Sequence, residues 1–263
     1  MKYKRSWFTY FLKSKGRHGI HSPFVFQFVN DCITTKVTKN FVTLRKSFIK
    51  SLLKDKESFE INDLGVGSKK MNQTRSANKL ARTASSRGIY GDLLWKISHF
   101  YKPTISLELG TSVGIGTLTL ADANKKGLVH TVEGCSSTLY KAEKQFSEFK
   151  LTNCITFNSD FKDFLSIQSN IKYDLVFLDG NHSKSATLTY LELLKNKSHD
   201  HTFFIFDDIR WSEDMWDMWQ ELVESEDFHV TIDLGRMGIA VKRPEQVKEH
   251  FVIRPRIFKT SYF

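Results

Sequence analysis

Six acidic side chains each follow a short apolar run: Glu108, Glu133, Asp160, Asp179, Asp207 and Asp208. Apolar runs of this length, separated by amphipathic stretches, are typical of the buried strands of a parallel sheet. Ligands of open α/β sheets bind at the carboxyl ends of the strands, so these acids are expected to gather along one edge. Neighbouring carboxylates raise one another's pKa. The pattern therefore predicts a positively charged ligand or a cation at that edge.

A glycine-rich turn follows the first of these strands. The sequence from Ser106 to Ala121 predicts a strand, a turn with Gly110, Gly114 and Gly116, and a helix that begins with apolar residues. Glycine allows a sharp turn and a close approach of a ligand to the main chain. The start of a helix supplies free N–H groups and a partial positive charge. A plain strand-to-helix turn is the alternative interpretation of this stretch alone.

The next strand, Leu128 to Glu133, ends in an acid. In nucleotide-binding βαβ units, an acid at this place binds the ribose hydroxyls. The turn Glu108-Leu-Gly110-x-x-x-Gly114-x-Gly116 resembles motif I of the class I methyltransferases, which bind S-adenosylmethionine, and the resemblance spans roughly residues 80–245. It implies cofactor contacts from Glu108, Gly110, Thr111, Ser112, Gly114, Gly116, Glu133, Gly134, Ser159, Asp160 and Asp179.

A second resemblance concerns Asp179-Gly-Asn-His182 after one strand and Asp207-Asp208 after the next. This pattern is similar to the metal-dependent O-methyltransferases related to catechol O-methyltransferase. It implies that Asp179, Asp207 and Asp208 bind a divalent cation, and oxygen ligands suit Mg²⁺. Such an ion lowers the pKa of a substrate hydroxyl and orients its oxygen toward the methyl group.

His182 stands where members of that family commonly have a lysine as general base. Histidine is a frequent general base at neutral pH, so His182 and Asp179 are the predicted catalytic residues. A surface residue at the start of a helix is the alternative for His182. Asn181 is a weaker candidate for a polar contact, and Arg210 and Trp211 are expected near the substrate mouth.

Strands that alternate with helices predict an α/β fold. We expect a doubly wound, seven-stranded, mostly parallel sheet that ends in an antiparallel hairpin, 229–234 with 238–242. Helices are expected at 136–149, 161–167, 185–194 and 212–223, the last capped by Ser212. The predicted domains are a basic helical extension or lid (1–80), a methyltransferase domain (81–245) and a tail (246–263).

The basic charge is concentrated near the N-terminus. Residues 1–75 hold 16 Lys/Arg and 5 Asp/Glu, whereas residues 76–263 hold 23 and 24. Such an arm favours an anionic partner such as RNA, a lipid headgroup or a phosphorylated substrate, although a solvated helical cap explains the charge equally well. Helices are expected within 1–30 and 36–56 and a polar loop at 57–78, where the bases Lys69, Lys70, Arg75, Lys79 and Arg82 would face substrate.

Two further signals in this arm are weak. The run from Arg17 to Phe24 resembles the N-terminus of a bacterial methyltransferase branch of unknown function, and His18 and His21 there are more often structural than ligands. A second glycine run, Asp63-Leu-Gly-Val-Gly67, is rejected as the cofactor turn because no apolar helix follows it.

Three unclustered cysteines and the lack of a long apolar run predict a cytoplasmic protein without disulfides or a transmembrane segment. The leading hypothesis is O-methylation of a small-molecule hydroxyl with metal assistance. The alternatives are a metal-independent methyltransferase that holds RNA or another polyanion on its basic arm, and a non-catalytic binding protein. The sequence leaves the oligomeric state open, a homodimer included.

Overall fold

The computed structural model of the chain describes residues 2–14, 19–61, 73–84, 86, 88–167 and 169–255. His18, the glycine run Asp63 to Gly67, and Lys69 and Lys70 lie outside the described residues. The sequence-based expectations for them therefore stay predictions.

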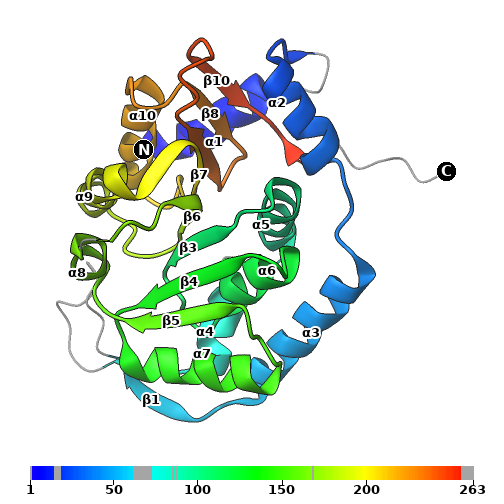
Figure 1. Cartoon of the computed structure of the whole chain (residues 1–263), viewed down its shortest axis with the longest axis vertical. Coiled ribbons are helices and arrows are strands. Elements are labelled where there is room, and N and C mark those ends of the chain that lie inside the picture. Colours follow the sequence, from blue (N-terminus) through cyan, green and yellow to red (C-terminus); the bar gives the residue numbers. More distant parts are fainter. Residues whose placement is uncertain are drawn as a thin grey trace.

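One eight-stranded sheet forms the centre of the molecule, in the order β10-β8-β9-β7-β6-β3-β4-β5 (Figure 1). Its strands are β3 (Ile105–Leu109), β4 (Leu128–Glu133), β5 (Cys154–Asn158), β6 (Tyr173–Leu178), β7 (Ser198–Phe206), β8 (Val230–Asp233), β9 (Gly238–Val241) and β10 (Glu249–Val252). Only β9 runs antiparallel to its neighbours β7 and β8. The predicted fold class and terminal hairpin are confirmed. The eighth strand, β10, was not expected, because it comes from the predicted tail and pairs in parallel with β8.

Helices cover both faces of this sheet. The strands are apolar on both sides: in β6, Leu175 and Phe177 pack toward one cluster, and Val176 and Leu178 toward the other. The first face is covered by α5 (Gly88–Tyr101), α6 (Ile115–Ala123) and the π-helical segment η2 (Phe28–Ile33), and the second by α8 (Phe161–Ser166), α9 (Lys184–Leu194) and α10 (Glu213–Glu224). Ser212 caps α10 as predicted, since its Oγ accepts the N–H of Met215 at 3.1 Å.

The N-terminal part is helical and lies against the sheet domain. It contains α1 (Lys2–Lys13), α2 (Pro23–Gln27), α3 (Lys39–Lys54) and α4 (Ala77–Thr83). Figure 1 shows α3 along one side of the molecule, and its Phe48 and Leu52 pack in a cluster with α6 and with α7 (Ser136–Glu148). The expected polar loop 57–78 is wrong at its two ends, where β1 (Ser58–Ile61) and β2 (Gln73–Ser76) pair as antiparallel strands. Short strands without alternating apolar residues give no signal in sequence.

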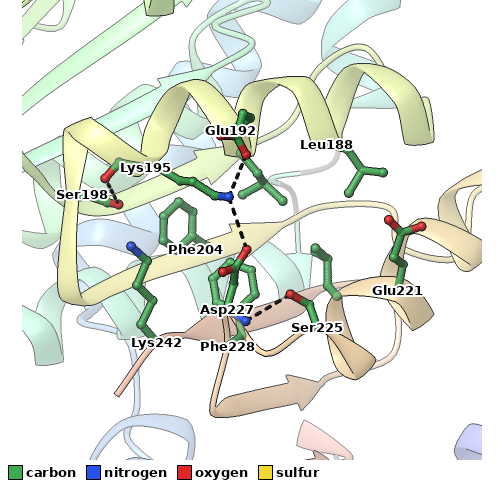
Figure 2. Close-up of a pocket in the computed structure, with 12 residues that line it drawn as sticks. Leu188, Glu192, Lys195, Ser198, Phe204, Glu221, Ser225, Asp227, Phe228 and Lys242 are labelled. Carbon is green, nitrogen blue, oxygen red and sulfur yellow. Dashed lines mark hydrogen bonds and ion pairs between the residues drawn. The ribbon is translucent and has the colours of Figure 1, made fainter. Parts of the chain in front are cut away.

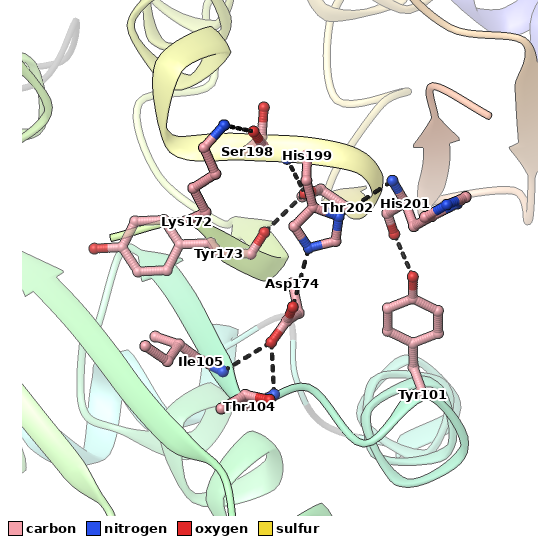
Figure 3. A network of polar contacts seen from close by, with 10 residues as sticks. All are labelled: Tyr101, Thr104, Ile105, Lys172, Tyr173, Asp174, Ser198, His199, His201 and Thr202. Atoms are coloured by element: carbon pink, nitrogen blue, oxygen red, sulfur yellow. Dashed lines mark hydrogen bonds and ion pairs between the residues drawn. The ribbon is translucent and has the colours of Figure 1, made fainter. Parts of the chain in front are cut away.

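The amino ends of β3, β6 and β7 are tied together by polar contacts (Figure 3). Oδ2 of Asp174 accepts the N–H groups of Thr104 at 2.6 Å and Ile105 at 3.0 Å, and Oδ1 lies 3.0 Å from Nε2 of His199. The predicted strand beginning at 203 in fact begins at Ser198, inside this network. The contacts lie at the opposite ends of the strands from the predicted ligand edge, so their role is to hold the register.

All three cysteines are free thiols. Among the described helices, none combines the length and apolar character needed to cross a bilayer.

Candidate functional site

A cavity of about 400 Å³ opens at the carboxyl ends of β3, β6 and β7. Small-molecule sites commonly measure about 300–1,000 Å³, so its size suits a ligand. Its walls come from the glycine turn, the β2–α4 region and the loops that carry the predicted catalytic residues. The residues that line it are Arg75, Leu80, Thr83, Ala84, Ser86, Gly110, Thr111, Ser112, Val113, Ile115, Gly116, Asp179, His182, Asp208, Trp211 and Arg236.

The three glycines of the turn serve different purposes. Gly110 has φ +113°, and a Cβ there would collide with the carbonyl of Asp179, so it lets two strand ends approach each other. Gly114, with φ +83°, caps α6 and leaves room for the ring of Phe146. At Gly116 a Cβ would occupy the place of the Glu108 carboxylate. These glycines were expected to let a ligand approach the main chain. At Gly114 and Gly116 the space is instead filled by side chains of the protein, Phe146 and Glu108.

Glu108 points into the protein. Its side chain is 1% exposed, and Oε2 accepts hydrogen bonds from Thr117 Oγ1 at 2.5 Å and Thr131 Oγ1 at 2.7 Å. Burial raises the pKa of Glu108 to about 7, against the lowering effect of these two hydrogen bonds. Glu108 is not among the residues that line the cavity. Its observed contacts fasten β3 to β4 and to α6.

Glu133 lies at the end of β4, next to the turn. Its Oε2 accepts the N–H of Ser112 at 2.9 Å and its Oε1 that of Cys135 at 3.0 Å. Gly134 follows it, and Ser159 and Asp160 follow the adjoining strand β5, where the N–H of Ser159 binds the carbonyl of Glu133 at 3.1 Å. Asp160 also caps α8. These predicted cofactor residues therefore share one edge, beside the cavity and not on its lining.

Three non-glycine residues near the cavity have left-handed backbones. Ser112, Asn181 and Asp208 have φ values of +48°, +48° and +54°. Each follows the end of a strand: β3, β6 and β7 in turn. Such conformations are strained for residues with a Cβ, and they concentrate at functional sites. The three loops that meet at the cavity thus share a strained geometry.

Arg236 is the residue that sequence reasoning missed. It lies in the turn between β8 and β9, and its guanidinium reaches the acids that follow β7. Nη2 lies 3.0 Å from Oδ2 of Asp207 and 3.2 Å from Oδ2 of Asp208. Nε lies 2.6 Å from Oδ1 of Asp208, in a geometry that suits an ion pair better than a hydrogen bond. The charge expected to balance the acidic edge is therefore, at least in part, a side chain of the chain itself.

Opposing effects act on the pKa of Asp208. Burial and the adjacent Asp207 raise the pKa of Asp208, while Arg236 and His182 act in the opposite direction. Asp207 is 1% exposed, and its Oδ1 has no hydrogen-bond partner. The main chain of Arg236 is fixed too, because its N–H donates to Tyr90 Oη at 3.1 Å.

The predicted magnesium ligands do not fit a cation as they stand. In the part of the chain that the structure describes, no three His, Cys, Asp or Glu side chains gather closely enough to hold a metal ion. A cation beside Asp207 and Asp208 would also have to displace the guanidinium of Arg236, which engages both carboxylates. The geometry therefore gives the predicted Mg²⁺ site no support.

His182 and Trp211 stand at the cavity as expected. His182 is partly exposed, its Nε2 lies 3.9 Å from Oδ2 of Asp208, and its ring lies 6.3 Å from that of Trp211. Trp211 is 67% exposed. Asp179 lines the cavity with them.

Arg210 was expected at the substrate mouth, and that expectation is wrong. Its side chain is 2% exposed and forms a bidentate ion pair with Asp233, in which Nη1 lies 2.7 Å from Oδ1 and Nη2 lies 2.5 Å from Oδ2. The rings of Trp7, Tyr10 and Trp216 surround its guanidinium. Of the predicted lid bases, Arg75 lines the cavity, whereas Lys79 and Arg82 do not.

A second cavity, of about 210 Å³, lies between α9 and α10 (Figure 2). Its floor is apolar, with Leu188, Phe204 and Phe228, and its charged rim is largely paired within itself. Nζ of Lys195 lies 2.7 Å from Glu192 and 3.7 Å from Asp227. It contains none of the predicted site residues, and it is smaller than most ligand sites.

Comparisons with known proteins agree with this fold. Residues 107–209 match a family model described as "Methyltransferase domain". No functionally curated protein matches the sequence. Similar solved structures include an O-methyltransferase from Bacillus cereus in complex with SAH (15% identity, TM-score 0.55, covering 82% of this chain and 96% of that one). A second is SAH-bound methyltransferase PaMTH1 from Podospora anserina (12% identity, TM-score 0.57, covering 85% of this chain and 96% of that one). A third is cofactor-bound Rv0187 from MTB (16% identity, TM-score 0.57, covering 78% of this chain and 91% of that one).

At these identities the structural likeness concerns the fold, and the family model adds the domain. The match begins in β3 and ends just after Asp208, so it includes the glycine turn, Glu133, Asp179 and His182. Residues 107–209 thus match a methyltransferase-domain model, and the chain has the Rossmann-like fold that these solved methyltransferases share.

Proposed function

We propose that the protein transfers a methyl group from S-adenosylmethionine to a hydroxyl oxygen of a small molecule, without a metal ion. One observation carries this proposal: a single cavity joins the glycine turn and the start of α6 to His182, Asp208 and Trp211. A cofactor held at the turn would therefore face the predicted base and an open aromatic mouth.

The turn supplies the cofactor end of the site. Ile115 and Gly116, the first residues of α6, line the cavity, and the start of a helix favours negative charge such as a carboxylate. Glu133 is proposed to bind the ribose, and Ser159 or Asp160 to lie near the adenine, because these residues follow the adjoining strands. The acids Asp179 and Asp208 make the other end of the cavity suitable for a sulfonium.

S-adenosylmethionine supplies a methyl group on a positively charged sulfur. When bound, it would give up this methyl to the acceptor oxygen, and the electron pair of the broken sulfur–carbon bond would stay on sulfur. The hydroxyl proton passes to Nε2 of His182, which Asp208 stabilises at 3.9 Å once it is protonated. Holding both reactants in one cavity accounts for much of the rate.

Arg236 supports the metal-free form of this reaction. In the metal-assisted alternative, Asp179, Asp207 and Asp208 would bind Mg²⁺. Here the guanidinium of Arg236 already lies between Asp207 and Asp208. It balances part of the negative charge that a metal ion would otherwise balance.

Calorimetry with S-adenosylhomocysteine tests the cofactor half. Wild type is expected to bind it, and Glu133→Gln to bind about 10- to 100-fold more weakly, the effect of a hydrogen bond to a charged group. Glu143→Gln is the matched control, because Glu143 is an exposed acid on α7. The absence of binding by folded wild type would refute the proposal.

Methyl transfer to a panel of phenols and catechols tests the chemical half. His182→Asn should bind S-adenosylhomocysteine as wild type does and lose about 10²- to 10⁴-fold in kcat. Unchanged kcat in this variant would remove His182 from the mechanism while leaving the cofactor site in place.

A further inference from the structure

The outer face of α1 exposes large apolar side chains. Phe8, Phe11 and Leu12 are 67%, 53% and 70% exposed. They lie three and four residues apart, so they form one stripe along the helix. Scattered exposed apolar residues are ordinary, whereas a continuous stripe indicates a binding surface.

The inner face of the same helix is fixed, so the stripe cannot turn inward. Tyr10 is 5% exposed, and its Oη donates a hydrogen bond to the carbonyl of Ile253 at 3.1 Å. The rings of Trp7 and Tyr10 pack on the guanidinium of Arg210, 5.3 and 5.1 Å from their centroids. In Figure 1, α1 lies beside α10 at one end of the molecule.

The charge of α1 is entirely positive. Its sequence contains Lys2, Lys4, Arg5 and Lys13 and no acidic residue. A further base comes from the other end of the chain, since Nη2 of Arg254 donates to the carbonyl of Phe11 at 2.8 Å. Apolar side chains combined with lysine and arginine on one helix are characteristic of helices that lie in the surface of anionic membranes.

We propose that α1 binds the surface of an anionic lipid bilayer, with Phe8, Phe11 and Leu12 inserted among the lipids. Two other partners fit less well. A second copy of the chain would bring two wholly basic helices together, and like charges across an interface are costly. RNA would use aromatic rings for stacking, but Leu12 is the most exposed of the three side chains and has no ring.

Flotation of the full-length protein with vesicles tests this proposal. Wild type is expected to float with phosphatidylglycerol–phosphatidylcholine vesicles, to stay in solution with pure phosphatidylcholine, and to be released by high salt. The double variant Phe8→Ser with Leu12→Ser should bind at least about tenfold more weakly. Its control is Tyr140→Ser with Ile167→Ser, which removes apolar side chains that are 64% and 62% exposed elsewhere.

Two sets of lysine substitutions, one in α1 and one in α3, test the electrostatic contribution to vesicle binding. Lys2→Gln, Lys4→Gln and Lys13→Gln together should weaken binding on the order of 100-fold. The same number of substitutions in α3, Lys39→Gln, Lys46→Gln and Lys50→Gln, should leave most of the vesicle binding intact. Circular dichroism confirms that each variant is folded.

Three outcomes would overturn the proposal. The first is no flotation of folded wild type with anionic vesicles, and the second is an equal loss in the α1 and α3 lysine variants. The third is a dimer in light scattering that only the Phe8–Leu12 variant breaks, without any vesicle binding, since it would identify the face as a subunit interface. None of these outcomes bears on methyl transfer.

Discussion

Nε of Arg236 lies 2.6 Å from Oδ1 of Asp208, across 28 residues of sequence. The pair joins the β8–β9 turn to the loop after β7, and both residues line the cavity. It therefore connects the terminal hairpin of the sheet directly to the proposed site of methyl transfer.

Arg236→Ala should destabilise the protein, because it leaves the buried Asp207 and the partly buried Asp208 without their counter-charge. Breaking a buried ion pair costs about 3–5 kcal/mol. Arg236 is 29% exposed, so solvent reduces the expected loss to about 1–3 kcal/mol. Urea denaturation measures it, with Arg236→Lys as the control that keeps the charge.

A double-mutant cycle separates the ion pair from other effects. Adding Asp208→Asn to Arg236→Ala should cost less than the two single changes together, because the unpaired charge is gone. Strict additivity of the free energies of unfolding would show that the two side chains do not interact.

Methyl transfer should continue in excess EDTA. Arg236 already pairs with both Asp207 and Asp208, so the chelator removes nothing that the proposed reaction needs. A magnesium-dependent methyltransferase assayed beside it shows that the EDTA treatment works. Loss of activity in EDTA, restored by Mg²⁺ alone, would instead support the metal-assisted mechanism.

Glu108 should make stability depend on pH. Its pKa is about 7 in the folded protein and 4.5 ordinarily, so between these values the unfolded chain has released a proton that the folded chain still holds. Stability should therefore fall as pH rises from about 4.5 to about 7, by on the order of 3 kcal/mol, and stay level above that range. Denaturation of wild type and Glu108→Gln across this range tests it. Parallel curves for the two proteins would contradict the prediction.

Gly114→Ala should destabilise more than Gly88→Ala. Both glycines have positive φ, +83° and +63°, so both alanines carry backbone strain of about 1 kcal/mol. At Gly88 a Cβ meets open space, whereas at Gly114 it meets the ring of Phe146. Overpacking adds about 1–3 kcal/mol, which thermal unfolding would resolve. Combining Phe146→Ala with Gly114→Ala should remove the free-energy cost that overpacking adds.

The alternation of strands and helices was predictable, because each strand is a short apolar run and each helix has apolar residues at helical spacing. Ser212 was readable as a cap, since local hydrogen bonds depend on neighbours in sequence. Strand ends in the sequence and the resemblance to methyltransferases indicated the glycine turn, Asp179, His182 and Trp211, all of which line the cavity.

Contacts between distant residues were not predictable. Arg210 and Arg236 both follow strand ends and look alike in sequence, yet one is buried against Asp233 and the other reaches the cavity. Their partners lie 23 and 28 residues away, so only the packed sheet decides which arginine meets which acid. For the same reason, Glu108 was expected to face a ligand, although it binds Thr117 and Thr131.

The eighth strand has a consequence for solubility. Without β10, the main-chain N–H and C=O groups along one side of the buried strand β8 would have no partner, and such an edge invites other chains to add to it and aggregate. The strand β10 is short and carries Glu249 and His250, which makes it a poor template for such pairing. Shortened versions of the protein that end before Glu249 are therefore expected to precipitate on expression.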